Sequence, residues 1–306
     1  MKKFVVIVNA CKDHNLEETR SLCSYIKTRG GSCTYLVSVD EQEGIRKVRT
    51  QDIPKGTECI LVLGGDGTLI RAARDTVACG IPLIGVNMGT LGYLCELETD
   101  TVYEALDQMM HGEYMLEERM MLSGWKEAPG VKQRSESVTA GQPNPLANGE
   151  CTVPLSYALN DIVIHRTGPL SLVSLTVYVN GQFLNTFQGD GVMVSTPTGS
   201  TGYNMSAGGP IVDPKAQLLL LTPINCHTLT QRSIVIDPHD EVVIEVGSRS
   251  TQRDETVEVS FDGDHGCCLN VGECIRIRRA DVSARILKFS KISFLEILRK
   301  KMQVHR

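Results

Sequence analysis

The sequence contains no long apolar run and no cluster of basic residues. Its densest apolar stretch, residues 217–221, is far shorter than the roughly 20 residues that a membrane-spanning helix needs. The net charge is −5, and no Lys/Arg run forms a basic patch of the kind that binds nucleic acid. The apolar run at 4–8 is too short for a signal peptide, and a polar segment without a cleavage site follows it. We therefore expect a cytoplasmic protein that binds neither membranes nor nucleic acid.

Cysteine patterns that would indicate disulfides or a metal site are also missing. The chain has 11 cysteines, an odd number, and none of them belongs to a Cys-x-x-Cys pair. Cys267, Cys268 and Cys274 form a local cluster, which reduced, partly buried thiols explain better than a zinc site does. With 42% apolar and 22% charged residues, the composition is that of a globular protein, and 306 residues allow one large domain or two ordinary ones.

The first hundred residues alternate between strand and helix patterns. Apolar runs typical of buried strands, each followed by helical spacing or a glycine loop, predict strands at 4–8, 32–39, 59–63 and 83–86 and helices at 16–29, 69–79 and 103–110. This alternation predicts an open, mostly parallel α/β sheet. Ligands of such sheets bind beyond the carboxyl ends of the strands.

Beyond residue 117 the pattern changes to that of antiparallel strands. Asn180-Gly181 is a strong hairpin signal. Strands are expected at 119–125, 160–166, 172–179, 182–188, 233–236, 241–246, 256–261, 273–278 and 284–287. The polar segment 126–153 is rich in Gly, Pro, Ser and Asn, and we expect a mobile loop there. The predicted organisation is an α/β domain at 1–110, a mostly antiparallel β domain at 111–288, and an amphipathic helix within 289–306 that packs back on the first domain.

The turn Gly64-Gly65-Asp66-Gly67-Thr68 stands between a predicted buried strand and a predicted helix. Glycine lets the backbone approach a phosphate closely, and free N–H groups at a helix start point at it. Asp66 repels phosphate directly, so it indicates a metal ion or the acceptance of a proton. The other interpretation is a tight turn in which Asp66 only caps the helix.

Two further segments have both a structural and a functional interpretation. The glycine-spaced segment 85–94 is a plain loop or a second surface of the same crevice, where Tyr93 could stack on a base. Asn160-Asp161 is common turn material, or an amide for an adenine edge beside a carboxylate for ribose hydroxyls. Strand alternation sends these two side chains to opposite faces unless a bend intervenes.

The string at 195–203, Ser-Thr-Pro-Thr-Gly-Ser-Thr-Gly-Tyr, follows an apolar strand. Its density of hydroxyl and N–H groups favours binding of a dinucleotide over a turn of purely structural purpose. The segment 222–229, Thr-Pro-Ile-Asn-Cys-His-Thr-Leu, comes later in the chain.

Taken in order, these motifs resemble those of the NAD kinases. The Gly-Gly-Asp-Gly-Thr turn is also similar to the signature of diacylglycerol and sphingosine kinases and of phosphofructokinases, but the later strings narrow the resemblance. The match covers nearly the whole chain outside 126–153. Asp161 stands where the family often has Glu, which shortens the reach by one methylene, and Gly202 and Cys226 replace a common alanine and proline.

The resemblance implies transfer of the γ-phosphoryl group of ATP, or of polyphosphate, to the 2′-hydroxyl of the adenosine ribose of NAD, giving NADP. It implies that Asp66 is catalytic, that Mg²⁺ arrives with the nucleotide, and that no residue of the chain is a dedicated metal ligand. Together with the glycine turn it implies binding roles for Gly65, Gly67, Thr68, Arg71, Tyr93, Asn160, Asp161, Asp190, Thr198, Ser200, Thr201, Gly202, Tyr203 and Ser206.

The implied partners are NAD, NADP and ATP, and the implied assembly is a homodimer or homotetramer joined by the β domains. Two alternatives remain. A lipid or sphingoid-base kinase shares the glycine-aspartate turn, but the Thr-Pro-Thr-Gly-Ser-Thr string argues against it. A non-catalytic NAD(P) sensor would have no need of an intact Asp66.

Overall fold

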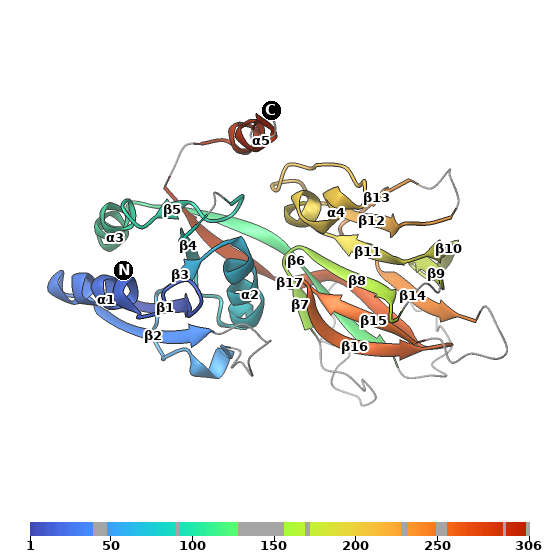
Figure 1. Ribbon diagram of the computed structural model, residues 1–306, viewed down its shortest axis with the longest axis horizontal. Coiled ribbons are helices and arrows are strands. Elements are labelled where there is room, and N and C mark those ends of the chain that lie inside the picture. The colour runs from blue at the N-terminus through green and yellow to red at the C-terminus, as the bar shows by residue number, and fades with distance from the viewer. Residues whose placement is uncertain are drawn as a thin grey trace. The chain divides into compact units, whose positions relative to one another are not determined.

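The structure is a computed structural model that describes residues 1–38, 48–89, 92–127, 156–168, 172–227, 232–248, 256–289 and 292–303 (Figure 1). The chain divides into two compact units: unit 1 is residues 1–119 and 282–306, and unit 2 is residues 120–281. Residues 126 and 127 of the expected loop end a strand, and the rest of that loop lies outside the described residues.

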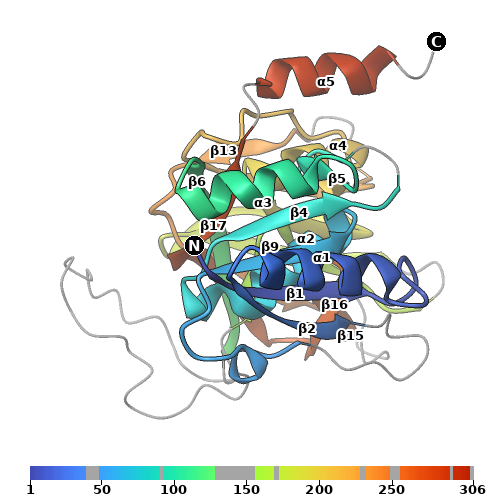
Figure 2. The same ribbon diagram turned by 90° about the vertical axis from the view of Figure 1, so that its left-hand side faces the viewer.

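Unit 1 is built on a parallel sheet with the strand order β2-β1-β3-β4 (Figure 1); Figure 2 shows β2, β1 and β4 from another side. Its elements are β1 (Lys3–Asn9), α1 (Glu17–Thr28), β2 (Ser32–Ser38), a 3₁₀ turn (Thr50–Asp52), β3 (Cys59–Gly64), α2 (Asp66–Thr76), a 3₁₀ turn (Val77–Cys79), β4 (Leu83–Asn87), β5 (Leu97–Glu98), α3 (Val102–His111) and α5 (Phe294–Gln303). Val6 of β1 lies opposite Tyr35 on one side and Leu61 on the other. Because the chain moves to opposite sides of β1, the topological switch point lies between β1 and β3.

The two faces of this sheet are covered by different helices. Phe4, Val6 and Val8 alternate along β1 and share one buried cluster with residues of α1 and α3. Helix α2 lies against the strands from the other face, where Leu69 packs closely on Gly85. Helix α2 begins at Asp66, earlier than the expected Leu69. A carboxylate in the first turn of a helix is favourable because the helix dipole is positive there.

Unit 2 consists of antiparallel strands in two layers around one core. The first layer has the order β13-β12-β11-β8-β15-β16; the second contains β10-β9-β14 with the first part of β17, together with β6 and β7. Side chains of both layers, such as Ile162 and Ile244, share one buried cluster, as in a β-sandwich. The elements are β6 (Met115–Glu127), β7 (Ser156–Ala158), β8 (Asp161–Arg166), β9 (Val173–Val179), β10 (Gln182–Gly189), β11 (Gly191–Ser195), a 3₁₀ turn (Thr198–Thr201), α4 (Tyr203–Ser206), β12 (Leu219–Ile224), β13 (Ile234–Ile236), β14 (Val242–Gly247), β15 (Thr256–Phe261), β16 (Asp264–Asn270) and β17 (Cys274–Lys288).

The predicted fold class, a mostly parallel α/β part followed by a mostly antiparallel β part, is confirmed. The hairpin at Asn180-Gly181 is confirmed as well, since both residues have positive φ and join β9 to β10. Several strands differ from the expectation. The strands expected at 273–278 and 284–287 are one continuous strand, β17, and the strands β5, β7, β12 and β16 were not predicted.

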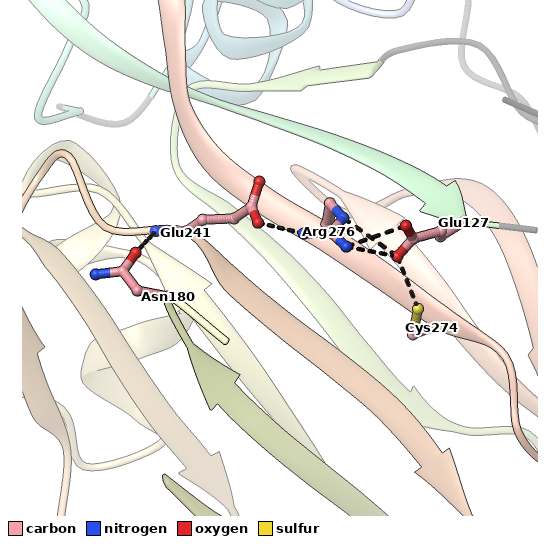
Figure 3. Close-up of polar contacts among 5 residues, drawn as sticks. All are labelled: Glu127, Asn180, Glu241, Cys274 and Arg276. Atoms are coloured by element: carbon pink, nitrogen blue, oxygen red, sulfur yellow. Dashed lines mark hydrogen bonds and ion pairs between the residues drawn. The ribbon is translucent and has the colours of Figure 1, made fainter. Parts of the chain in front are cut away.

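A charged cluster joins β6, β17 and the residue before β14 in unit 2 (Figure 3). The Arg276 guanidinium on β17 bonds both carboxylate oxygens of Glu127 at 3.0 Å and also pairs with Glu241, which precedes β14. The Cys274 thiol donates to Glu127, and burial, followed by the charge of that carboxylate, raises the pKa of Cys274 to about 12. Because β6 ends at Glu127, this cluster fixes the strand at the point where it ends.

The C-terminal helix α5 belongs to unit 1. Its Lys301 ammonium lies 4.4 Å from the centre of the Tyr93 ring, a cation–π distance. Among the helices that the structure describes, none has the length and apolar character to cross a membrane.

Candidate functional site

The glycine-aspartate turn lies at the topological switch point of unit 1. Gly64 ends β3 and Asn9 ends the neighbouring strand β1, so both stand at the carboxyl edge of the parallel sheet. Asn9 reaches across with its amide, whose Nδ2 donates to Thr68 Oγ1 at 3.4 Å. Thr68 is buried and packs against Gly64, where no side chain would fit. The turn is therefore placed where open α/β sheets bind their ligands.

The Asp66 carboxylate is held by three successive backbone N–H groups. Tyr93 donates to Oδ2 at 2.5 Å, and Leu94 and Cys95 donate to Oδ1 at 3.1 and 2.9 Å. A carboxylate offers about four accepting positions, two on each oxygen. The backbone fills both positions on Oδ1 and one on Oδ2. The Cys95 thiol is also hydrogen-bonded to this carboxylate, so residues 93–95 hold Asp66 through backbone and side-chain groups.

The segment that holds Asp66 requires glycine next to Tyr93. A Cβ at Gly92 would stand 1.9 Å from Asp66 Oδ1, so any side chain there would displace the carboxylate or the backbone. Burial, followed by the charge of Asp66, raises the pKa of the Cys95 thiol. This thiol therefore stays protonated and contributes no nucleophile near Asp66.

The other predicted residues of unit 1 surround this carboxylate to different degrees. Gly65 caps α2 in an extended conformation, and Gly67 is exposed in the first turn, so the helix start is open to an anion. Arg71 stands on α2 and is partly buried. The backbone N–H of Tyr93 contacts Asp66, and the Tyr93 ring lies under the Lys301 ammonium. Burial raises the pKa of the Tyr93 hydroxyl.

Unit 2 contains a cavity of about 990 Å³, a size that fits a nucleoside or a larger part of a dinucleotide. Four of the predicted binding residues line it: Asn160, Asp161, Asp190 and Tyr203. The further lining residues are Val163, His165, Arg166, Gly168, Ile224, Glu258, Ser260, Asp262 and Gly263. Segments far apart in the chain thus form one polar cavity.

Asn160 and Asp161 both face this cavity because the backbone bends before β8. Residues 159 and 160 form a bend and β8 begins at Asp161, so the strand alternation that would separate the two side chains does not yet apply. The Asn160 Oδ1 atom is shielded from solvent, and no group in the described residues donates to it. A ligand N–H, such as the exocyclic amine of a purine, would satisfy this acceptor.

The Asp161 carboxyl is 5% exposed, and burial together with the nearby charge of Asp262 raises its pKa from 3.8 to about 7. At pH 8 the carboxylate is ionised and can accept hydrogen bonds from a pair of vicinal hydroxyls. Burial, followed by the charges of Asp190 and Asp161, also raises the pKa of Tyr203.

The hydroxyl-rich string at 195–203 uses several of its groups within the chain. The Ser200 hydroxyl donates to the carbonyl of Val212 at 3.1 Å and accepts the N–H of the same residue at 3.0 Å. Thr201 donates to the Thr198 carbonyl at 3.4 Å. Thr198 is buried, Gly202 is partly buried, and Ser206 is exposed at the end of α4. Part of this string therefore stabilises the loop that carries Tyr203 to the cavity.

Several cavity residues were not predicted from the sequence. Arg166 pairs with Asp190 at 2.7 Å, and Asn225 donates to the second oxygen of that carboxylate at 2.9 Å, so Asp190 is neutralised within the cavity wall. Asp262 stands in the short turn between β15 and β16, which the sequence presents as an ordinary Asp-Gly turn. Only the pairing of β15 with β8 brings it beside Asp161.

The described residues contain no preformed metal site. Within them, no three His, Cys, Asp or Glu side chains are placed so that they could hold one ion. A divalent cation that arrives with a nucleotide needs no such cluster, because phosphate oxygens and water supply most of its ligands.

Comparisons with known proteins agree along the whole chain. Residues 4–114 match the ATP-NAD kinase N-terminal domain and residues 159–289 match the ATP-NAD kinase C-terminal domain. The chain is 50% identical to a NAD kinase of Agathobacter rectalis, over 99% of both chains. It is 37% identical to a NAD kinase of Lachnospira eligens, over 99% of this chain and 100% of the relative.

Two solved structures share the fold at lower identity. The yeast NADH kinase complexed with NADH has a TM-score of 0.76 and 21% identity, covering 99% of this chain and 88% of that one. The NAD kinase from Archaeoglobus fulgidus in complex with ATP has a TM-score of 0.70 and 19% identity, covering 98% of each.

Proposed function

The chain belongs to the NAD kinase family, and from this we propose that it transfers the γ-phosphoryl group of Mg·ATP to the 2′-hydroxyl of the adenosine ribose of NAD, giving NADP. The observation that carries the proposal is the Asp66 carboxylate, which three backbone N–H groups hold at the carboxyl edge of a parallel sheet. Oδ2 accepts one of these bonds and Oδ1 accepts two, so we assign the 2′-hydroxyl proton to Oδ2.

Phosphoryl transfer asks the protein mainly to position the reactants and to neutralise charge. As the 2′-oxygen bonds to the γ-phosphorus and the bond to the β-phosphate oxygen breaks, Asp66 takes the hydroxyl proton. The start of α2, with Gly65, Gly67 and Thr68, offers N–H groups to the phosphates. Arg71 lies one turn further along the helix, and we propose that it contacts them too.

The cavity of unit 2 supplies the binding groups. We propose that Asn160 Oδ1 accepts the adenine amine and that the Asp161 carboxylate accepts ribose hydroxyls. Asp161 is one methylene shorter than glutamate, but it still lines the cavity. Tyr203, 48% exposed, offers a ring on which the ligand can stack. Tyr93, Asp190, Thr198, Ser200, Thr201, Gly202 and Ser206 complete the proposed binding set.

The donor and the cation are proposed as one substrate, ATP with bound Mg²⁺. The complex of the Archaeoglobus fulgidus enzyme with ATP supports this donor. We further propose a cytoplasmic enzyme that supplies NADP and works as a homo-oligomer joined through unit 2.

A coupled assay with NAD, ATP and Mg²⁺ tests the reaction, with polyphosphate and NADH as the alternative donor and acceptor. NADP should form only when acceptor, donor and cation are all present. Asp66→Asn should lower kcat by about 10²–10⁴-fold, the usual contribution of a positioned general base, while the Kd for NAD from calorimetry stays within threefold. Near-normal turnover by this variant would remove Asp66 from its assigned role.

A further inference from the structure

We propose that Asp262 is a positioning residue of the dinucleotide site: its carboxylate holds the backbone of residues 159–161 so that the side chains of Asn160 and Asp161 face the same cavity. This inference rests on the proposed function of the site as the NAD-binding cavity. Asp262 makes no contact with the reacting groups in this assignment and acts through its two neighbours.

Asp262 bonds this backbone segment through both its carboxylate and its own N–H group. Asp262 Oδ2 accepts the N–H of Leu159 at 2.8 Å, and Oδ1 accepts the N–H groups of Asn160 and Asp161 at 2.7 and 3.2 Å. The Asp262 N–H donates back to the Asp161 carbonyl at 3.0 Å. One side chain therefore satisfies three successive donors that a regular strand would point in alternate directions.

The opposite side of the same bend is held by Thr196. Its N–H donates to the Asn160 carbonyl at 2.8 Å, and its hydroxyl donates to the Leu159 carbonyl at 2.6 Å. The bend thus has its donors bound by Asp262 and its acceptors bound by Thr196. A segment held from both sides cannot relax into the regular strand that would turn one of the two side chains away from the cavity.

The backbone at Asp262 is in an uncommon conformation. Its φ is +52°, in the left-handed region, where glycine, asparagine and aspartate are tolerated better than other residues. Gly263, with φ +83°, follows it in the turn between β15 and β16. Strained residues cluster at functional sites because the surrounding structure has a reason to keep them. The three hydrogen bonds to residues 159–161 supply such a reason.

The charge of Asp262 also acts on the ligand-binding carboxyl. Burial and then the charge of Asp262 raise the pKa of Asp161 to about 7. Ribose hydroxyls bind the ionised form, so NAD affinity should rise with pH through this range. The other titratable or charged groups that line the cavity are His165, Arg166, Asp190, Tyr203 and Glu258. They remain in place when Asp262 is replaced.

Two variants separate the hydrogen bonds from the charge. Asp262→Asn keeps the left-handed preference and one accepting oxygen, whereas Asp262→Gly fits the same φ without strain and keeps no acceptor. We expect the Kd for NAD at pH 8 to rise about 10-fold in Asp262→Asn and about 100-fold in Asp262→Gly, as expected for loss of one or more charge-assisted bonds. The KM for ATP should stay within twofold.

The pH dependence distinguishes positioning from general damage. NAD affinity should be measured by calorimetric titration from pH 5.5 to 9. The pH at which the rise in affinity is half complete (the midpoint) should be lower in both variants, because Asp161 loses a neighbouring negative charge. Asp240→Asn is the matched control: Asp240 also caps backbone, accepting the Asp237 N–H at 3.1 Å, but it does not line the cavity. Its NAD affinity and midpoint should equal those of the wild type.

The outcomes are separable. If Asp262→Asn does not fold, Asp262→Gly, which is free of backbone strain, carries the test. NADP formation by the wild type together with unchanged NAD affinity and midpoint in Asp262→Gly would overturn this inference alone. A wild-type chain that neither binds NAD nor forms NADP would overturn both this inference and the proposed function.

Discussion

Each unit of this protein contains one aspartate whose carboxylate accepts three successive backbone N–H groups, but the two contacts work in opposite directions. In unit 1, residues 93–95 hold Asp66, the side chain to which we assign the chemistry. In unit 2, Asp262 holds residues 159–161, the backbone that carries the proposed binding groups. The same interaction therefore fixes the proposed catalytic carboxylate in one unit and the proposed recognition segment in the other.

This difference predicts different consequences of damage. Disturbing the contact in unit 1 should lower kcat and leave NAD affinity intact, because the reacting group moves. Disturbing the contact in unit 2 should weaken NAD binding first, because the recognition groups move. The variants below test this separation.

Among the variants that test this comparison below, Gly92→Ala should have the largest effect. Its Cβ would stand 1.9 Å from Asp66 Oδ1, so the carboxylate or its backbone donors must shift. A misplacement of this kind typically costs about 100-fold in rate, so kcat should fall by about that factor while the Kd for NAD stays unchanged. Gly89→Ala is the matched control, since the nearest atom to its Cβ would be Lys12 Nζ at 3.7 Å, an ordinary contact. Equal kcat values for the two variants would contradict the assignment.

Gly199→Ala tests the unit 2 side of the comparison. Its Cβ would stand 2.2 Å from the Asn160 carbonyl oxygen, inside the bend that Asp262 and Thr196 hold. Overpacking costs roughly 1–3 kcal/mol of unfolding free energy, and the Kd for NAD should rise about 10-fold. Gly247→Ala is the control, because the nearest atom to its Cβ would be the Ser174 hydroxyl oxygen at 3.2 Å and Gly247 does not line the cavity. A lower kcat with unchanged Kd in Gly199→Ala would break the proposed separation.

Asp161→Asn should weaken NAD binding and increase the free energy of unfolding. The pKa of Asp161 is about 7 in the folded protein and 3.8 ordinarily, so ionising the carboxyl disfavours folding as pH rises from about 4 to about 7. Asparagine removes that penalty. Urea unfolding should show the variant more stable by on the order of 2–4 kcal/mol at pH 8 and no more stable below pH 4. Its NAD affinity should fall and lose its pH dependence; a variant less stable than the wild type at pH 8 would refute the argument.

The smallest effect is expected from Lys301→Ala. The ammonium over the Tyr93 ring is worth about 0.5–1 kcal/mol at an exposed site, so kcat or KM should change by about two- to fivefold. The neighbouring Lys300 is exposed, and Lys300→Ala is the control. Identical kinetics for the two variants would mean that α5 has no influence on the segment that holds Asp66.

Features that depend on neighbouring residues could be predicted from the sequence. Features that depend on the pairing of strands far apart in the chain could not. The turn at Asp66, the hairpin at Asn180-Gly181 and the alternation of unit 1 are visible because glycine, apolar runs and turn residues act on their own neighbours. Asp262 was missed because the residues that it holds lie more than a hundred positions earlier, and only the pairing of β8 with β15 brings them together. The strand β16 was missed because its apolar residues, Cys267, Cys268 and Leu269, are consecutive and do not alternate with polar ones.

Ser200 shows the same limit for the binding string. A run of hydroxyl side chains suggests donors for a ligand, and the sequence cannot distinguish these from hydroxyls that the chain uses itself. Both bonds of Ser200 go to the Val212 backbone, a partner outside the motif. The predicted binding roles of this string therefore depend on which hydroxyls remain available to a ligand. Tertiary contacts decide which ones these are.

Unit 1 is discontinuous in the chain, and this has a consequence for how the protein is made. Ile286 of β17 pairs with Leu83, and Leu287 lies in the same buried cluster as Phe4 and Leu61. On the ribosome, the strands of unit 1 emerge first, yet their last partners are translated only after all of unit 2. Unit 1 therefore stays incomplete until residues beyond 282 leave the exit tunnel, while unit 2, a single continuous segment, is complete before them.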